Sequence, residues 1–533
     1  MNNLMTYKRM CLLILVLIQP VLPARAAPEK NIFDVMEYRV EGNTVLPLGK
    51  IEEAVYPHLG EAKSIDDVEL ARTALEKAYH EAGYLTVLVN IPEQEVDEGF
   101  VKLAVVEGSV EKLRVVDAKF NSLAALKERV PEFSEGKIPN FTEVQKQIAA
   151  VNGTQDRRVA PVLRPGKSPG KVEVDLKVQD KLPLHGGLEL NNRYSANTTE
   201  TRLSGSLRYD NLWQKDHSLG LSFQVTPEKL DETKVLSATY LIPRNGDFLA
   251  LYGVISRSDI SAIGDVNVIG NGDIVGLRYI HPLPAVDNFT HSMTLGVDYK
   301  DFKESTIALG SDSFNTPISY LPFMLGYDAT YDDGAGGSTQ LNLGLNFSLR
   351  GLADGNVECL PDVFYNEFAC KRSGAQPNYA YLRADLKHTQ NVYKGWKVYA
   401  SVGGQLSDQP LISSEQYALG GLDSGRGYLE STALGDSGIN VTLELRTPPL
   451  QKYLSDKIGD LHGLAFFDAG HVSVKDALAS QTDTFNLASV GLGLHLKGWN
   501  GFFGEMEFAK ALRAAGQVED GDTRVHFRMG YDW

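Results

Sequence analysis

Cysteine is almost absent from this chain, which has three in 533 residues. Cys11 lies in an apolar N-terminal run, so Cys359 and Cys370 are the two left for the remainder of the chain. Two cysteines eleven positions apart in an exported chain predict one disulfide that closes a loop. Two free thiols are the alternative. The cysteine and histidine spacings of a metal centre are missing, so no metal site is predicted.

Long hydrophobic runs and active-site motifs are also missing. After the N-terminus no segment approaches the roughly 18 consecutive apolar residues of a membrane-spanning helix, so any span must be a β-barrel. The chain has no G-x-S-x-G, H-E-x-x-H or P-loop motif, and we therefore predict no catalytic residues, no cofactor and no enzyme activity. The net charge is −16 and no basic block stands out, which argues against nucleic acid as a partner.

The N-terminus indicates export. Lys8 and Arg9 precede an apolar run at residues 11–18, and Ala24-Arg25-Ala26 provides a cleavage site of small residues. The apolar run is short for a membrane span, so residues 1–26 are predicted to be a signal peptide that is removed. A retained N-terminal anchor is the alternative.

The next 150 residues contain two units of one plan, strand–helix–helix–strand–strand, assigned to residues 27–108 and 109–180. In the first unit, Ser64 and Asp67 form a capping pair before a long amphipathic helix, and Gly83 is placed to end it. In the second, Asn140 and Glu143 open the corresponding helix. These units predict small α+β modules.

From residue 181 to residue 533 the pattern changes to alternating strands separated by turns or polar loops. Sixteen strands are expected, and the last is the clearest. On it Val525, Phe527, Met529, Tyr531 and Trp533 share one face, and polar residues dominate the other. This alternation predicts a 16-stranded antiparallel transmembrane β-barrel with an apolar face toward lipid. A soluble β-sandwich, which can also alternate, fits the signal peptide and the terminal aromatic strand less well.

Two outward loops of this barrel have distinctive sequences. The fifth, at about residues 351–377, contains both cysteines and is expected to have no sheet to support it. The sixth, residues 408–436, is glycine-rich and carries Gly425-Arg426-Gly427-Tyr428. An acidic partner is offered by Phe466-Phe467-Asp468-Ala469-Gly470, in which Phe466, Asp468 and Gly470 share one face of a strand. Because arginine presents a planar fork to carboxylates, we expect Arg426 to meet Asp468 inside the channel.

These motifs resemble those of a known family. Residues 40–44 (VEGNT) and 106–108 (VEG) in the tandem modules resemble POTRA domains, and residues 165–176 resemble the haemolysin secretion/activation (ShlB/FhaC/HecB-type) transporters of two-partner secretion. The superfamily carries [VI]-R-G-[YF] at a loop tip and F-x-D-x-G on a strand. The resemblance implies that Arg426 anchors the loop and that Asp468 receives it.

The resemblance also implies a cellular role. A barrel in the bacterial outer membrane, with POTRA domains in the periplasm, would bind a secreted haemolysin-like or adhesin-like exoprotein and translocate it unfolded. Outer-membrane lipid would surround the barrel. The barrel-assembly machinery would be a partner during biogenesis, with Phe527, Tyr531 and Trp533 resembling its recognition signal. One alternative is a factor that inserts other outer-membrane proteins, but such relatives usually carry three or more POTRA domains. A passive small-solute porin is the other alternative, but a porin needs no peptide-binding modules.

Two departures from the family pattern lead to further expectations. Gly425 stands where the family has an aliphatic residue, so the loop tip is expected to pack less against the barrel wall. Residues 27–32 are too few for the pore-plugging helix that begins many family members. We therefore expect no plug, with closure depending more on the Arg426 loop.

Overall fold

The computed structural model describes residues 32–533 except 97, 259, 264–265, 270, 308–312, 353–354, 361–362, 452–458, 480 and 499–500. The predicted signal peptide and residues 27–31 lie outside the described part. The chain divides into two compact units, Met1–Lys181 and Leu182–Trp533. Within the described residues, no helix has the length and apolar character needed to cross a membrane.

The first module is built on a three-stranded sheet in the order β2-β5-β4. Its elements are β1 (Phe33–Val35), β2 (Glu37–Glu41), α1 (Leu48–Val55), η1 (Tyr56–His58), β3 (Gly60–Lys63), α2 (Ile65–Glu81), β4 (Val87–Asn90) and β5 (Phe100–Glu107). The capping box of Ser64 and Asp67 opens α2, as the sequence predicts. Leu75 and Tyr79 then project from α2 into an apolar core against the sheet. The small β1–β3 sheet was not predicted.

The second module repeats this plan with the sheet order β6-β8-β7. Its elements are β6 (Ser109–Val116), α3 (Leu123–Glu128), η2 (Pro131–Phe133), α4 (Phe141–Val151), β7 (Arg157–Pro165) and β8 (Lys171–Asp180). The Asn140 side chain accepts hydrogen bonds from the N–H groups of Thr142 and Glu143 and so caps α4. A separate apolar core lies between the helices and the sheet.

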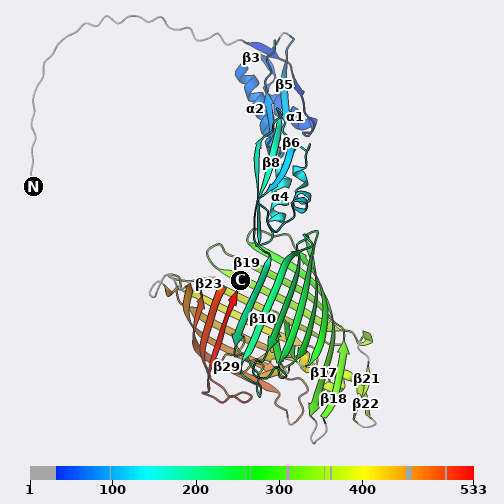
Figure 1. Cartoon of the computed structure of the whole chain (residues 1–533), viewed down its shortest axis with the longest axis vertical. Helices are drawn as coiled ribbons and strands as arrows, with labels where there is room; N and C mark the ends of the chain where they lie inside the picture. The colour runs from blue at the N-terminus through cyan, green and yellow to red at the C-terminus, as the bar shows by residue number, and fades with distance from the viewer. Residues whose placement is uncertain are drawn as a thin grey trace, which may run out of the picture. The chain divides into compact units, whose positions relative to one another are not determined.

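The second unit is a closed antiparallel barrel of sixteen strands (Figure 1). Its wall comprises β9 (Leu184–Asn191), β10 (Arg202–Leu212), β11 (His217–Val225), β12 (Lys234–Arg244), β13 (Asp247–Arg257), β16 (Gly272–Pro282), β17 (Phe289–Ile307), β18 (Ser313–Tyr320), β19 (Pro322–Asp332), β20 (Ser338–Ser348), β23 (Ala380–Asn391), β24 (Lys397–Ser407), β27 (Ser437–Arg446), β28 (Asp460–Ser473), β29 (Thr484–Lys497), β30 (Phe502–Ala511) and β31 (Thr523–Asp532). The one predicted strand near Ile318 is two segments, because β18 and β19 pair with successive halves of the long β17. The two segments together fill one place in the wall.

The wall has the two faces that the alternation predicts. Leu443, Phe467 and Phe508 are exposed on the outside, whereas their sequence neighbours Glu444 and Asp468 are buried inside. Such an outer apolar surface is what a barrel in lipid requires. β31 closes the barrel against β9. At the end of that seam, Trp533 exchanges backbone hydrogen bonds with Gly186, where a side chain would collide with the indole ring.

The outward connections contain elements that were not predicted. They are the hairpins β14 (Ile260–Ile263) with β15 (Val266–Ile269), β21 (Asn356–Leu360) with β22 (Val363–Asn366), and β25 (Tyr417–Leu419) with β26 (Ala433–Gly435). The short helix α5 (Glu367–Lys371) follows β22. The expectation that the cysteine-bearing loop lacks a sheet is therefore wrong, because β21 and β22 pair within it. Figure 1 shows this hairpin at the same end of the barrel as the β17–β18 extension.

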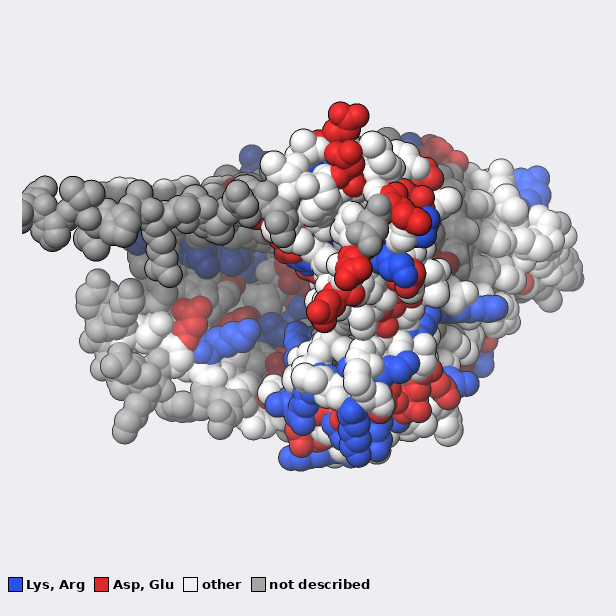
Figure 2. All heavy atoms as spheres, turned by 90° about the horizontal axis from the view of Figure 1, so that it is seen from above, with Lys and Arg blue, Asp and Glu red and all other residues white. Residues whose placement is uncertain are grey.

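The two N-terminal modules differ in charge. Residues 33–108 contain 16 acidic and 6 basic side chains, and residues 109–180 contain 10 acidic and 13 basic. Figure 2 shows acidic side chains gathered toward the upper part of the face seen from above, and a group of basic side chains along its lower edge. The first module is therefore strongly acidic, and the second carries a small excess of basic side chains.

Candidate functional site: a loop held inside the barrel

The loop at residues 408–436 connects β24 to β27 and is folded into the barrel. It contains the single turn η4 (Ser413–Glu415) and the hairpin of β25 and β26, with Arg426 in the segment between these two strands. Leu419 and Tyr428 are fully buried in an apolar cluster with Val472 and Leu487 of β28 and β29. The Tyr428 hydroxyl oxygen lies 3.0 and 2.8 Å from the carbonyl oxygens of Ala488 and Arg513, which share its one proton. The loop tip thus packs on the inner wall.

Arg426 makes a two-pronged contact with Asp468 of β28. Its Nε donates to Oδ2 at 2.9 Å and its Nη2 to Oδ1 at 2.7 Å, and the Arg426 backbone N–H also donates to Oδ2 at 3.1 Å. The two residues are only 3 % and 1 % exposed. A paired fork of this kind is the strongest arginine–carboxylate geometry, and burial protects it from screening by salt.

Two further carboxylates converge on the same guanidinium. Its Nη1 donates to Glu444 Oε1 of β27 at 2.8 Å and to Glu507 Oε2 of β30 at 3.4 Å. Arg446 binds the other oxygen of Glu444 at 2.6 Å, and His495 Nε2 lies 2.7 Å from Glu507 Oε1. Three buried acidic groups therefore surround one cation, so the site loses its main compensating charge if Arg426 leaves.

The wall residues around the pair are shaped to receive the loop. The Phe466 ring lies under the guanidinium, with Arg426 Cζ 3.5 Å from the ring centroid. A side chain at Gly427 would come within 2.8–3.0 Å of Ser489 and the Ala511 backbone, and one at Gly470 within 2.6 Å of Leu419. These two glycines let loop and wall approach closely. At Gly425 a side chain would make ordinary contacts beginning at 3.4 Å, so this position has room.

The sequence motifs predict one site for five residues, and these residues lie together in the structure: Arg426, Asp468, Phe466, Gly427 and Tyr428. The sequence reasoning missed Glu444, Glu507 and His526, whose Nε2 lies 2.6 Å from the Arg426 carbonyl oxygen. A usable signal was present, because an acidic residue between apolar neighbours on a barrel strand faces the lumen. Alternation alone, however, does not show which lumen residues the loop tip reaches.

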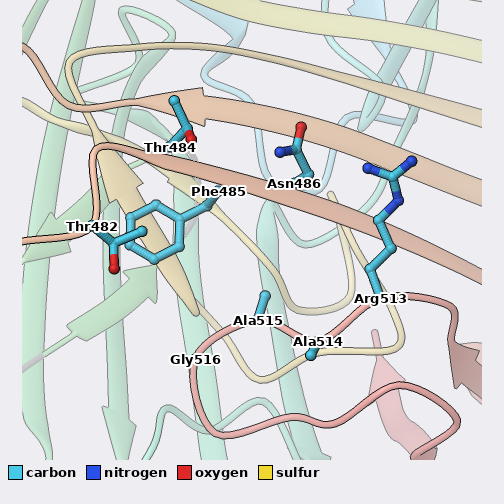
Figure 3. Close-up of a pocket in the computed structure, with 8 residues that line it drawn as sticks. All are labelled: Thr482, Thr484, Phe485, Asn486, Arg513, Ala514, Ala515 and Gly516. Carbon is cyan, nitrogen blue, oxygen red and sulfur yellow. The ribbon is translucent and has the colours of Figure 1, made fainter.

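An open hollow lies beside the loop tip, between the start of β29 and residues 513–516. Figure 3 shows the Phe485 ring turned toward Thr482, with Asn486 and Arg513 on the opposite side of the hollow and Ala514–Gly516 below it. Phe485 packs against the cluster that contains Tyr428. The hollow is a gap at the edge of the loop's packing.

The other predicted site residues lie away from the loop tip. Cys370 in α5 is disulfide-bonded, and the Cys359 side chain lies outside the described residues. Phe527, Tyr531 and Trp533 share the outer face of the C-terminal strand, and the Tyr531 and Trp533 rings stack with centroids 6.0 Å apart.

A closed barrel with an apolar outer face, a loop pinned in its lumen and two preceding α/β modules define the class of protein: an outer-membrane transporter. Comparisons with known proteins identify the family. A ShlB-type POTRA domain matches residues 33–108, and the haemolysin secretion/activation protein family ShlB/FhaC/HecB matches residues 335–496. The chain is a two-partner secretion transporter of this family, located in the outer membrane with POTRA domains in the periplasm.

Individual relatives agree with this assignment. The chain is 24 % identical over 491 residues to the outer membrane transporter CdiB of Dickeya dadantii, covering 86 % of this chain and 79 % of that one. It is 22 % identical over 465 residues to the heme/hemopexin transporter protein HuxB of Haemophilus influenzae, covering 85 % and 79 %. Among solved structures, CdiB from Escherichia coli has the same fold, with a TM-score of 0.62, 18 % identity and coverage of 97 % and 93 %.

A barrel-assembly protein shares this fold as well. BamA from Haemophilus ducreyi lacking POTRA domains 1–3 gives a TM-score of 0.55 at 14 % identity, covering 94 % of this chain and 100 % of that one. Fold alone does not separate secretion from assembly. The family matches do, since members of this family are transporters that act with secreted exoproteins through POTRA domains.

Proposed function

We propose that the loop at residues 408–436 is the gate of this transporter and that the Arg426–Asp468 pair is its lock. The observation that carries the proposal is the burial of one arginine among three carboxylates at the tip of a loop that packs on the inner wall of the barrel. Moving this tip exposes the charges to water, which then solvates them. The Arg426–Asp468 pair is therefore strong while water is excluded, and it can separate and re-form when the exported chain brings water into the lumen.

The proposal includes a cargo and a domain assignment. Residues 1–26 act as a signal peptide, 27–108 and 109–180 as POTRA domains, and 181–533 as the pore. The cargo is a haemolysin-like or adhesin-like exoprotein that crosses unfolded. The excess of acidic side chains in residues 33–108 favours a basic cargo segment at the first module.

Extended peptide binds small α/β modules by adding a strand to a sheet edge, and four edges are available here. The β4 edge is occupied by α2 side chains, since Arg72 donates to the Val89 carbonyl at 3.2 Å and Glu76 accepts from the Val89 N–H at 3.0 Å. The β7 edge carries Pro161, which cannot donate. The β6 edge is occupied near its start, because the Val110 N–H donates to the Lys137 carbonyl and the Val110 carbonyl accepts from the Gly136 N–H.

The β2 edge contains no proline, and the described contacts place no side-chain cap on its backbone. We assign the cargo strand to β2. Photo-crosslinking probes at Glu37 and Arg39 should capture cargo during export, whereas matched probes at Leu88 on β4 and Lys77 on α2 should not. Capture from Leu88 instead would contradict this edge assignment.

Two structural roles complete the proposal. A Cys359–Cys370 disulfide fastens the β21–β22 hairpin to α5, and the bonded state of Cys370 supports it. Phe527, Tyr531 and Trp533 form the signal read by the barrel-assembly machinery, and the outer face of the barrel contacts lipid. The functional test is deletion of the gene. Loss of one large exoprotein from the medium with unchanged outer-membrane proteins is expected, and broad loss of barrels would instead indicate an assembly factor.

A further inference from the structure

Two carboxylates of the loop are as deeply buried as Arg426 and Asp468, and they lie toward the two ends of the loop. Glu415, in η4, is 2 % exposed, and Asp436, the last loop residue, is fully buried. Neither belongs to the arginine motif or to the aspartate motif. A buried carboxylate is retained only where charged and hydroxyl partners compensate it, so the partners show what these residues hold.

Glu415 is fixed to the barrel wall by three strands. Its Oε1 accepts from Lys300 Nζ of β17 at 2.6 Å and from the Tyr320 hydroxyl of β18 at 2.5 Å. Its Oε2 accepts from the Tyr381 hydroxyl of β23 at 2.7 Å. The tip, in contrast, contacts β27, β28 and β30. The start of the loop and its tip are therefore held by different strands of the wall.

Asp436 is fixed by the cysteine-bearing outward segment. Arg372, which follows α5, donates from both Nη atoms to the two Asp436 oxygens, with Nη2 to Oδ2 at 2.7 Å. The N–H groups of Leu411 and Lys475 donate to the same carboxylate at 2.8 and 2.6 Å. Arg372 also binds the Leu411 and Lys475 carbonyls, so this one side chain ties together the β28–β29 connection and both ends of the loop.

One amide joins the two ends directly. The Gln405 side chain of β24 donates to the Glu415 carbonyl at 3.0 Å and to the Asp436 carbonyl at 3.1 Å. Arg383 of β23 donates to the Gln405 Oε1 at 2.5 Å and so orients the amide. The segment between the two ends is the β25–β26 hairpin, with Arg426 in the stretch that joins its two strands.

We propose that Glu415 and Asp436 are two fixed anchor points, here called the feet, about which the hairpin at residues 417–435 rotates as a rigid unit. This inference rests on the proposed gate. The tip lock breaks during export while the feet remain bound, and the hairpin then returns to the same position. Glu415 and Asp436 are positioning residues, and Arg372 makes the fifth outward segment part of the gate.

Planar-bilayer recordings of the full chain separate the feet from the tip. In R426Q the pore should open about tenfold more often, with brief openings that return to the original closed level, because the feet are intact. In E415Q/D436N each opening should last about tenfold longer, with several conductance levels, because the hairpin has lost its hinge. R372Q, which removes the arginine partner of Asp436, should also lengthen the openings. The control D231N removes an exposed carboxylate of another outward connection and should behave as the parent protein.

The outcomes distinguish failure of this inference from failure of the gate. If R426Q conducts as the parent does, the gate itself is wrong. If R426Q opens but E415Q/D436N gives the same brief openings or matches D231N, the fixed feet are wrong. R372K tests folding and geometry together, because lysine keeps the charge without the two-pronged fork. It should give intermediate open times, and heat-dependent mobility in detergent gels should be retained by every variant. A full return to parental behaviour in R372K would contradict the role of the fork.

Discussion

The two units of this chain fill their interiors in opposite ways. Each N-terminal module has an apolar core under a three-stranded sheet, and the buried charged groups among the described residues of this unit are Arg157 and Asp175, both in the second module. The barrel lumen instead holds its loop with Arg426, Asp468, Glu415 and other buried charges. Apolar packing is stable whenever water surrounds the outside, whereas a buried ion pair is stable only while water is kept out. The proposed gate uses this difference, because the contacts that hold the loop weaken when water enters and the apolar cores of the modules do not.

The largest expected effect is at the loop lock. Arg426→Gln removes the guanidinium that Asp468, Glu444 and Glu507 share. The free energy that favours the docked loop should therefore fall by about 3–5 kcal/mol. Asp468→Asn should cost less, because Arg426 keeps two carboxylates. Hydrogen exchange of residues 417–435 in the full chain measures both.

The double variant sharpens this result. In Arg426→Gln/Asp468→Asn one excess negative charge is removed, so the combined loss should be smaller than the sum of the two single losses. Strict additivity would show that the two side chains act independently, contrary to their bidentate contact.

A second prediction concerns the apolar side of the comparison. Leu75 of α2 is fully buried in the first module, so Leu75→Ala should destabilise that module by about 2–4 kcal/mol and leave the loop docked. Among the described residues the helices α1–α4 belong to the N-terminal unit and the short α5 to the barrel, so circular dichroism at 222 nm in urea reports mainly on the modules.

The matched control is Leu70→Ala on the same helix, where the side chain is exposed. The free energy of unfolding of the module should change by less than about 0.5 kcal/mol in this variant. Equal shifts for the two variants would mean that apolar packing does not hold the module together.

The third prediction tests how tightly loop and wall approach. Gly427→Ala places a methyl group within 3.0 Å of the β30 backbone and should weaken loop docking by about 1–3 kcal/mol. Gly425→Ala meets only ordinary contacts and has no left-handed backbone angle, so it should be neutral or stabilise docking by up to about 1 kcal/mol. Hydrogen exchange of the loop separates them, and equal effects would contradict the close approach at Gly427.

The sequence was sufficient for features with a local or periodic signal. The Ser64–Asp67 capping box, the alternation in β31 and the strand parity that turns Asp468 inward are all encoded within one element. The same reasoning could not supply Glu444 and Glu507, because their relation to Arg426 depends on how a 29-residue loop folds back across three strands. It also missed the β21–β22 hairpin, whose strands of five and four residues are too short for a clear alternation.

The smallest expected effect lies at a polar contact of the second module. Asp180, at the end of β8, accepts hydrogen bonds from the backbone N–H groups of Lys119, Phe120 and Asn121 and from the Asn121 side chain, at 2.8–3.1 Å. Burial raises the pKa of this carboxyl, but the hydrogen bonds outweigh burial and the pKa is lowered overall. The carboxylate therefore joins the loop at residues 119–121 to the sheet.

A lowered pKa means that the folded module favours the charged form of Asp180. Its stabilising contribution is present above the unfolded pKa of about 3.9 and is lost as the pH falls through the lower folded value. Asp180→Asn should cost about 1 kcal/mol near neutral pH, since the group is partly exposed, and the difference from the parent protein should shrink in acid. Urea midpoints followed at 222 nm test this, with Asp117→Asn, an exposed site one residue beyond β6, as the control. A difference that stays constant with pH would assign the effect of Asp180 to its shape rather than its charge, and the contrast between apolar modules and a charged lumen would then be sharper.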